Sequence, residues 1–576
     1  MKKFEIEKSK DNYNILKILD GDKCKYIGSK YNQKREIDKL INEVRPFTEK
    51  DIYIIFGLSF GEHIKELISK NNFNNKILVI DVLNDWCEYC SAESEISEIL
   101  KGKNITLGKT VDEVKKFFRE NVNDFNIDWV KIGYYGKYDC IFKEELKEIL
   151  EFIRDEFYLR VSNKNTKIYF SEKWYETLTQ NLKYIVNSIP VNRLENKYKN
   201  KPAVIVSAGP SLDKNIRELK GKDNLLVFSG GRTIKPLLEN NIEPSLLGVV
   251  DPGEISYDLV SDYMESLKCP LLFYEGTNER VVKEHKGEKV FYTSNEFIRK
   301  VFNERIVDFA LGGSIAHALT LFAAYIGCNP IVFIGQDLAY TEDKYHSNSS
   351  NRRVHNKLDK GENFFYVDDI NGNKVKTSPI LNDFRIVLEE IIKLFPETKF
   401  INATEGGANI KGTEVKNLKE TIKSLNEEIV EFKIDINQNY EVQKNIILEL
   451  NKSVETFFEL KRVSKKGLYL LDELISYYNK NPHKVEKLLK DLDEVDNNIK
   501  KYIKELHIVK NLIFSKVHIL ENDLKFIITE LDDKEDRFNK NINKNKAIYN
   551  LIYEILDYSE PMLREIISEE LIKVEF

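Results

Sequence analysis

The stretch that decides the fold is Pro202-Ala-Val-Ile-Val-Ser-Ala-Gly-Pro-Ser-Leu-Asp213. Its apolar, β-branched first half predicts a buried strand, Pro202–Val206. Gly209 then permits a tight turn, Pro210 fixes its backbone, and Ser211 stands where the N-cap of a following helix would be. A strand that runs into such a turn and a helix is the unit of a parallel α/β sheet. The backbone N–H groups of this turn, Gly209 to Leu212, are expected to form a cradle for a phosphate.

The same unit recurs along the chain, which predicts one sheet with a polar edge. Further strands are expected at Leu225–Phe228, Leu246–Val250, Pro270–Tyr274, Ile331–Ile334 and Lys399–Ile401. The polar or glycine residues at their ends are Ser229, Gly230 and Gly231, then Asp251, Glu275, and Gln336, Asp337 and Tyr340, while Gly312, Gly313 and Ser314 open an apolar helix. Because parallel strands end at one edge, where open α/β sheets bind ligands, these residues predict a single ligand site.

An earlier block, with strands at Asp51–Phe56 and Lys76–Asp81, has the layout of a Rossmann-like domain. The turn Gly57–Gly61 follows the first strand and Asp81 ends the second, as in a dinucleotide or S-adenosylmethionine site. Ser59, however, stands where a second glycine would let a phosphate approach. We therefore favour a structural Rossmann-like domain over a cofactor site.

The last part of the chain, 417–576, is nearly free of glycine and proline, which predicts an all-α domain. A 3,4 spacing of apolar residues runs from Val485 to Val509, after the helix-starting pair Asn481-Pro482. This seam fits a helical bundle within the chain, or a homo-oligomer through the same helices. A polar break at Ser162–Asn165 leads into the central block. The predicted domains are thus 1–165, 166–416 and 417–576.

Composition excludes several classes of protein. The 576 residues carry 88 Lys+Arg against 94 Asp+Glu, a net charge of -6, so no global basic field predicts a nucleic-acid partner. Six cysteines, with a lone Cys87-x-x-Cys90, do not predict a disulfide scaffold or a zinc site. Charges interrupt the N-terminus, and polar residues interrupt the apolar stretch from Ile315 to Gly335. We therefore expect a cytoplasmic protein without stable membrane insertion.

The central motifs resemble those of the motility-associated factor (Maf) flagellin glycosyltransferases. They are Gly209-Pro-Ser-Leu-Asp213, Asp251-Pro252, Gly312-Gly-Ser314, Gly335-Gln-Asp-Leu338 and Asn402-Ala-Thr-Glu-Gly-Gly407, and the resemblance covers about Thr166 to Lys416. It implies transfer of a nonulosonic sugar, of the pseudaminic or legionaminic acid type, from a CMP-activated donor. The implied acceptors are Ser or Thr hydroxyls of flagellin in the cytoplasm, a step needed for flagellum assembly and motility.

The central block is more distantly similar to bacterial CMP-sialic-acid sialyltransferases, which implies an α/β domain that is a variant of the GT-A fold. By that likeness Gly209, Pro210 and Ser211, and Gly312, Gly313 and Ser314, form two turns that hold CMP. Asp337, Tyr340 and Tyr345 match the strand end whose tyrosines bind its phosphate. The catalytic histidine of that family falls at Thr377-Ser378, so its base does not transfer.

For the base, we expect His346 by residue type, with Asp251 and Glu275 as alternatives at neighbouring strand ends. The competing reading of His346 is a solvated loop histidine, whereas His317 on the apolar helix is expected to be a packed core residue. Arg352 and Arg353 are candidates to meet a sugar carboxylate. No Asp-x-Asp ends a strand, so we expect no metal, although Mg²⁺ stays possible.

Two rival functions come from other classes of protein. One is a diphosphokinase acting on 6-hydroxymethylpterin, which would need Mg-ATP and carboxylate pairs near the phosphate. The other is a non-catalytic flagellin-binding chaperone, in which residues 417–576 would grip flagellin.

Overall fold

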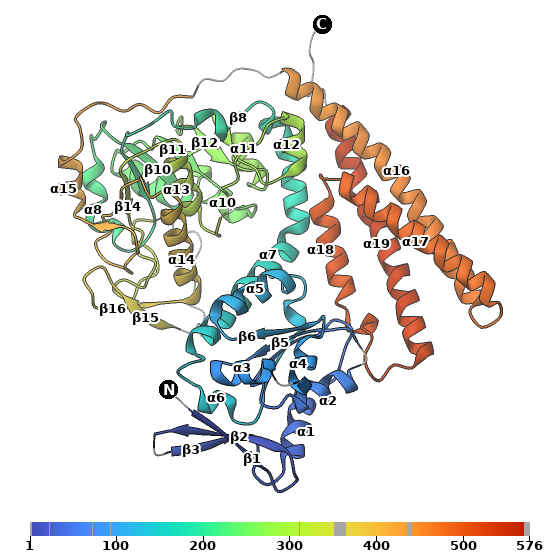
Figure 1. Cartoon of the computed structure of the whole chain (residues 1–576). Helices are drawn as coiled ribbons and strands as arrows, with labels where there is room; N and C mark the ends of the chain where they lie inside the picture. Colours follow the sequence, from blue (N-terminus) through green and yellow to red (C-terminus); the bar gives the residue numbers. More distant parts are fainter. Residues whose placement is uncertain are drawn as a thin grey trace. The chain divides into compact units, whose positions relative to one another are not determined.

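A computed structural model of the chain describes residues 3–21, 23–71, 73–92, 94–309, 311–350, 364–434 and 440–568 (Figure 1). The chain divides into two compact units. The first comprises Met1–Tyr169, Arg462–Asn497 and Ile513–Ile555, and the second comprises Phe170–Lys461, Asn498–Leu512 and Leu556–Phe576. Because both units contain residues from 417–576, the three-domain division of the sequence stays a prediction. Arg352 and Arg353 lie outside the described residues.

The first unit contains the expected Rossmann-like sheet. Its parallel strands lie in the order β6 (Ile105–Gly108), β5 (Lys76–Ile80), β4 (Ile52–Phe56) and β7 (Val130–Tyr134). The accompanying helices are α1 (Gln33–Glu43), α2 (Glu62–Lys70), α3 (Asn84–Ala92), α4 (Ser94–Leu100), α5 (Val111–Asn121) and α6 (Tyr138–Ile141). An antiparallel sheet of β1 (Lys3–Lys8), β2 (Asn14–Asp20) and β3 (Lys23–Ile27) precedes them.

The turn after β4 is occupied by the chain's own groups. The carboxylate of Asp81 accepts hydrogen bonds from the backbone N–H of Leu58 (2.8 Å) and from the Tyr138 hydroxyl (2.8 Å). The Tyr138 ring also covers Gly57, where an added Cβ would lie 2.8 Å from it. The acid that a ribose would need is therefore engaged within the fold, as expected for a structural Rossmann-like domain.

In the second unit, the described residues form a parallel sheet of nine strands. Its order is β18 (Glu414–Val415), β17 (Phe400–Asn402), β14 (Ile331–Ile334), β9 (Ala203–Val206), β10 (Leu226–Gly230), β11 (Leu246–Gly248), β12 (Leu271–Phe273), β13 (Lys289–Phe291) and β8 (Ile189–Pro190). From β9 the chain first builds outward to β13 and then returns to place β14 on the other side of β9. This reversal is a topological switch point, where open α/β sheets bind ligands.

Helices and turns cover this sheet (Figure 1). They are α8 (Leu212–Asn215), α9 (Gly231–Glu239), α10 (Glu254–Asp258), α11 (Glu279–Glu284), α12 (Glu296–Phe302), α13 (Ile315–Tyr325), α14 (Pro379–Leu394) and α15 (Leu418–Lys423), with the hairpin β15 (Phe365–Asp368) and β16 (Lys374–Thr377). The apolar α13 packs closely on the strands because Gly230 and Gly248 leave room for Ile315. A Cβ at either glycine would lie 2.8 Å from the Ile315 side chain.

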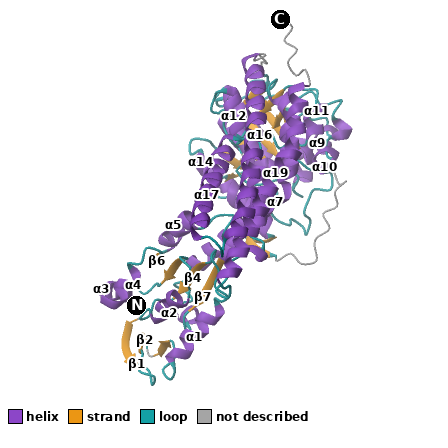
Figure 2. Cartoon of the chain, turned by 90° about the vertical axis from the view of Figure 1, so that its right-hand side faces the viewer, coloured by secondary structure: helices purple, strands orange, loops and turns teal. Residues whose placement is uncertain are grey.

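The remaining described helices, purple in Figure 2, are α7 (Lys147–Ile185), α16 (Tyr440–Tyr477), α17 (Pro482–Glu505), α18 (Lys510–Glu521) and α19 (Lys534–Ser568). The helix α7 is continuous over 39 residues. The expected break at Ser162–Asn165 is therefore wrong. Lys164 in that segment is largely buried and forms an ion pair with Asp128, so a tertiary contact compensates for the poor helix formers around it.

The predicted seam on α17 is buried, and its helix starts where expected. The Asn481 side chain accepts from the N–H of Lys484 (3.1 Å), and Leu488 and Val495 are buried. Tyr549 of α19 donates to Asp496 of α17 (2.6 Å), so these helices pair within the chain. None of the described helices combines the length and the apolar character that a membrane span requires.

Candidate active site

A cavity of about 280 Å³ opens at the carboxyl edge of the second unit's sheet, at the switch point between β9 and β14. Of the predicted site residues, those that line it are Gly209, Gly230, Gly231, Asp251, Gly313, Ser314, Gln336, Asp337, Tyr345 and His346. Turns far apart in the sequence thus meet at one place, because parallel strands of one sheet end at a common edge.

The Gly209 turn packs against the strand end that follows β14. Val206 of β9 pairs with Ile334 of β14, so the two turns lie side by side. An added Cβ at Gly209 would lie 2.3 Å from the Asp337 carboxylate and 2.5 Å from the Gly335 carbonyl. Glycine is required here because two backbone segments approach each other too closely for a side chain.

The expectation that this turn offers its N–H groups to a phosphate is wrong. The N–H of Gly209 donates to the Gly335 carbonyl (2.7 Å), and that of Leu212 donates back to the Gly209 carbonyl (3.0 Å). The N–H of Ser211 donates to the Asp337 carboxylate (3.2 Å), which the Ser211 hydroxyl also contacts (2.6 Å). The proline between them has no N–H. The turn therefore shapes the cavity wall and is held by Asp337.

Cationic character comes from other elements of the site. Arg232, in the first turn of α9, lines the cavity, and sequence reasoning missed it although it follows the predicted Gly230-Gly231 pair. Ser314 caps α13 by accepting from the N–H of Ala316 (3.3 Å), and the cavity touches this helix start. The N-termini of α9 and α13 thus add their positive dipole ends to the Arg232 charge.

Arg232 interacts electrostatically with the carboxylate of Asp251. Burial lowers the pKa of Arg232 from its usual value, while Asp251 and Tyr345 favour its charged form. Burial raises the pKa of Asp251, and the Arg232 charge opposes that rise. The two side chains therefore stabilise each other's charge, and Asp251 remains accessible to solvent.

His346 lies on a loop that is tied to the Gly209 turn. The next residue, Ser347, donates its N–H to the Ala208 carbonyl (2.9 Å), and Asp213 accepts from the N–H of Asn348 (2.7 Å). Burial first, and the nearby Arg232 charge second, lower the pKa of His346 to about 4. Its buried Nε2 has no hydrogen-bond partner among the described residues. The imidazole is therefore neutral near pH 7 and is not a solvated loop histidine.

The other predicted site residues lie outside the cavity lining. They are Pro210, Ser211, Leu212, Ser229, Glu275, Gly312, Tyr340 and Thr377. Tyr340 packs on Tyr345, with ring centroids 5.5 Å apart, and Thr377 donates its hydroxyl to the Leu338 carbonyl (2.9 Å). Ser229 is fully buried and pairs with the Thr233 hydroxyl (2.8 Å).

Glu275 and His317 are buried in the surrounding structure. Burial raises the pKa of Glu275 to about 7. His317 is fully buried, its Nε2 lies 2.9 Å from the Phe384 carbonyl, and burial lowers its pKa to about 4. The expectation of a packed core histidine on α13 is confirmed. Among the described residues, no cluster of three or more His, Cys, Asp or Glu side chains is arranged to hold a metal.

Comparisons with known proteins place this fold. Residues 176–343 match the family described as MptE-like, 6-hydroxymethylpterin diphosphokinase MptE-like. Comparison with curated proteins finds no match. The structure is similar to that of the Maf glycosyltransferase from Magnetospirillum magneticum AMB-1, with a TM-score of 0.56, 14% sequence identity, and coverage of 98% of this chain and 93% of that chain. The resemblance in the motifs is thus confirmed at the level of the fold: this chain has the fold of a Maf glycosyltransferase.

Proposed function

We propose that the protein is a glycosyltransferase that moves a nonulosonic acid of the pseudaminic or legionaminic type from its CMP-activated donor to Ser or Thr hydroxyls of flagellin. The observation that carries the proposal is one cavity that joins a cationic wall to a neutral histidine and a carboxylate. Arg232 and the starts of α9 and α13 form the cationic wall of the cavity, which Asp251 and His346 also line.

The cationic wall suits the departing CMP. When the bond between the sugar's anomeric carbon and the phosphate oxygen breaks, both bonding electrons stay on that oxygen and the phosphate gains charge. Arg232 and the two helix N-termini are fixed before the reaction, so they stabilise this charge without reorganising. Asp251, which lines the same cavity, stabilises the positive charge that develops on the sugar ring.

His346 suits the acceptor side of the reaction. The flagellin hydroxyl forms a new bond to the anomeric carbon and loses its proton to the unpartnered Nε2 of His346. A base with a pKa of about 4 is weak, but binding of the donor's phosphate raises the pKa of His346. The phosphate neutralises Arg232 and adds negative charge nearby, and both effects raise the pKa of His346 in the complex.

The cofactor and partner assignments complete the proposal. The reaction requires no cofactor beyond the CMP-sugar donor, because Arg232 and the helix ends serve the leaving group where a nucleotide-bridging metal would otherwise act. Transfer that persists at full rate in EDTA is the expected result. The acceptor is flagellin in the cytoplasm, before export, and no nucleic acid takes part. A homo-oligomer through the C-terminal helices also stays a proposal.

The test is the intact mass of flagellin co-expressed with this protein and a nonulosonic acid pathway. We expect a mass increment equal to one or more sugars, which is absent with the Arg232→Met variant. Unmodified flagellin in the presence of the folded wild-type protein and a confirmed CMP-sugar pool would refute the proposal.

The match of residues 176–343 to the MptE-like family favours a second candidate, a diphosphokinase acting on a hydroxymethylpterin. The same cationic wall would then bind the phosphates of ATP. Consumption of ATP that depends on the pterin and on Mg²⁺, without release of CMP from a CMP-sugar, would favour this candidate.

A further inference from the structure

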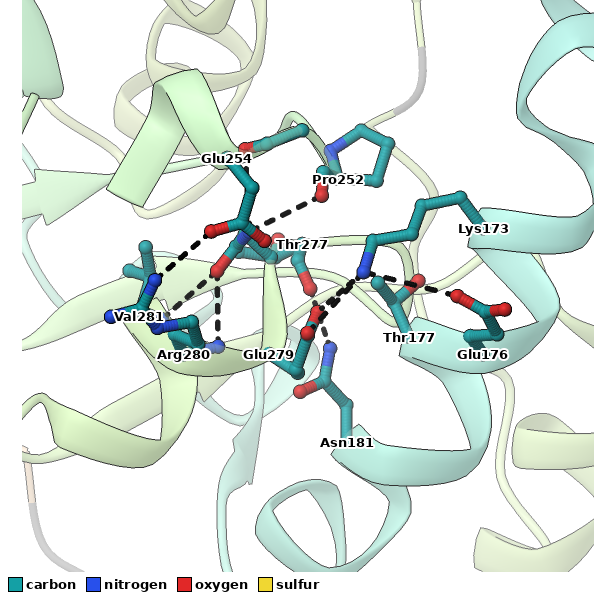
Figure 3. Close-up of polar contacts among 12 residues, drawn as sticks. Lys173, Glu176, Thr177, Asn181, Pro252, Glu254, Thr277, Glu279, Arg280 and Val281 are labelled. Atoms are coloured by element: carbon teal, nitrogen blue, oxygen red, sulfur yellow. Dashed lines mark hydrogen bonds and ion pairs between the residues drawn. The ribbon is translucent and has the colours of Figure 1, made fainter. Parts of the chain in front are cut away.

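The loop that carries Asp251 is held by side chains that follow the next strand. Figure 3 labels Pro252 of this loop, together with Thr277 and Asn181. Asn278 donates its backbone N–H to the Asp251 carbonyl (3.0 Å). Its side-chain amide donates to the carbonyls of Pro252 and Gly253, at 3.3 Å each. The carbonyls of the cavity acid and of the two residues that follow it are thus bonded to a single asparagine.

Two further buried groups complete this support. The Thr277 hydroxyl donates to the Val249 carbonyl (2.9 Å), just before the loop. Asn181 of α7 donates to the Thr277 carbonyl (2.7 Å) and to the Glu275 carbonyl (3.1 Å). Asn181, Thr277 and Asn278, which we call the loop clamp, are fully buried.

The loop clamp holds a segment of backbone that has little regular secondary structure. Between the end of β11 and the five residues of α10, the loop contains Pro252 and Gly253 and lies beyond the sheet ladder. Its carbonyls would lose their protein partners if the clamp were removed, and an unpaired buried carbonyl such as that of Pro252 is costly. A buried hydrogen-bond network of this kind specifies one conformation of the loop.

We propose that Asn278 is a positioning residue, which holds the Asp251 carboxylate at the place in the cavity where it faces Arg232 and the reacting sugar. This inference rests on the proposed function and deepens it. Asn278 lies outside the cavity lining and acts through Asp251. Its effect is therefore on the rate of the chemical step rather than on donor affinity.

Asn278 has a second role, which the experiment must separate. Its side-chain oxygen caps α11 by accepting from the N–H groups of Arg280 (3.0 Å) and Val281 (3.4 Å). Serine is also a good N-cap residue but lacks the amide that reaches the loop. Asn278→Ser therefore keeps the cap and removes the side-chain part of the clamp, without adding a charge near Asp251.

Asn295→Ser is the matched control. Asn295 caps the neighbouring α12 by accepting from the N–H of Phe297 (2.9 Å), and among the described contacts its side chain does not bond to the Asp251 loop. Both substitutions shorten a capping asparagine in the same unit. A loss that comes only from a weaker cap would affect them alike.

The experiment measures steady-state transfer from a CMP-nonulosonate donor by the full-length chain, well below the melting temperature of each variant. We expect Asn278→Ser to lower kcat by about 10- to 100-fold, the cost of displacing a reacting group by about 1 Å, with the donor KM within about threefold of wild type. Asn295→Ser keeps the wild-type kcat. On an Asp251→Asn background, adding Asn278→Ser causes no further loss, because the two residues act as one unit.

A wild-type kcat for Asn278→Ser, or a full additional loss on the Asp251→Asn background, would overturn the inference. If Asn278→Ser does not fold, Asn278→Thr also keeps a capping hydroxyl without adding a charge, and the same kinetic comparison applies. If the wild-type protein shows no transfer, the proposed function fails separately. The pKa of Asp251, measured by carboxyl-carbon NMR, then decides on positioning: Asn278→Ser must shift it and Asn295→Ser must not.

Discussion

Replacing Arg232 with methionine is the perturbation that most directly tests the electrostatics of the cavity. Methionine keeps an unbranched chain of similar length and removes the charge. A charge-assisted hydrogen bond between a guanidinium and a phosphate is worth about 1.5–3 kcal/mol, so Arg232→Met should weaken CMP binding by about 10- to 150-fold. Lys235→Met is the control, because Lys235 lies on the same helix, in an exposed pair with Glu239.

The same variant has a second consequence, which needs no ligand. Arg232 lowers the pKa of His346, so its removal must raise that pKa above about 4. Burial, the larger cause, is unchanged, so the new value stays below the ordinary 6.5. For Asp251 the sign is also upward, because Arg232 is the charge that opposes the effect of burial there.

Isothermal titration with CMP and histidine NMR over pH 3–8 measure the two effects. CMP affinity should fall, and its dependence on salt should weaken, only in Arg232→Met. An unchanged CMP dissociation constant together with an unchanged pKa of His346 would refute the assignment of Arg232 to this cavity. Equal effects of Lys235→Met would show that the general charge of α9, and not Arg232, is responsible.

Three further predictions concern the turn, the base and a buried acid. Gly209→Ala should lower the melting temperature and abolish CMP binding, because its Cβ would lie 2.3 Å from the Asp337 carboxylate. Gly221→Ala is the control, because its Cβ meets no atom within 4 Å and it introduces only the strain of a positive φ. Equal losses in the two variants would contradict the close approach at Gly209 as the cause. The kcat/KM of wild-type transfer should stay constant as the pH falls below 6.5 and should drop near pH 4, because His346 of the free protein becomes protonated there. A drop centred at pH 6.5 would exclude His346 as the base. The pKa of Glu275 is about 7 in the folded protein against an ordinary 4.5, so its ionisation destabilises the fold as the pH rises from 4.5 through 7, by about 3 kcal/mol when complete. Glu275→Gln should remove this loss of unfolding free energy, measured by urea unfolding at pH 8. A variant whose stability depends on pH as the wild type's does would contradict the prediction.

Much of the fold could be predicted from local sequence. Strands β9 to β12, β14 and β17 of the central sheet, the capped start of α17 at Asn481 and the helix that opens after Ser314 all follow from patterns spanning a few residues. The short strands β8, β13 and β18 were not predicted. The continuous α7 could not be predicted, because its polar segment is stabilised by an ion pair between Lys164 and a residue distant in sequence, Asp128.

The location of the candidate site could be predicted from the sequence, but the partners of its polar groups could not. The strand ends indicated the edge of the sheet at which the cavity lies, since parallel strands share it. The partners of individual groups were not predictable, because they come from other turns. Asp337 takes up the N–H of Ser211 that was expected to bind phosphate, and the cationic group is Arg232, whose importance depends on where the start of α9 lies.

The most direct test of the proposed transfer is mass spectrometry of a mixture of purified full-length protein, CMP-nonulosonate and unmodified flagellin. We predict that flagellin gains one nonulosonic acid mass for each CMP released. Asp251→Asn and Arg232→Met should lower both signals together. Flagellin of unchanged mass beside an intact donor, with the folded wild-type protein present, would contradict the assignment of this cavity to sugar transfer.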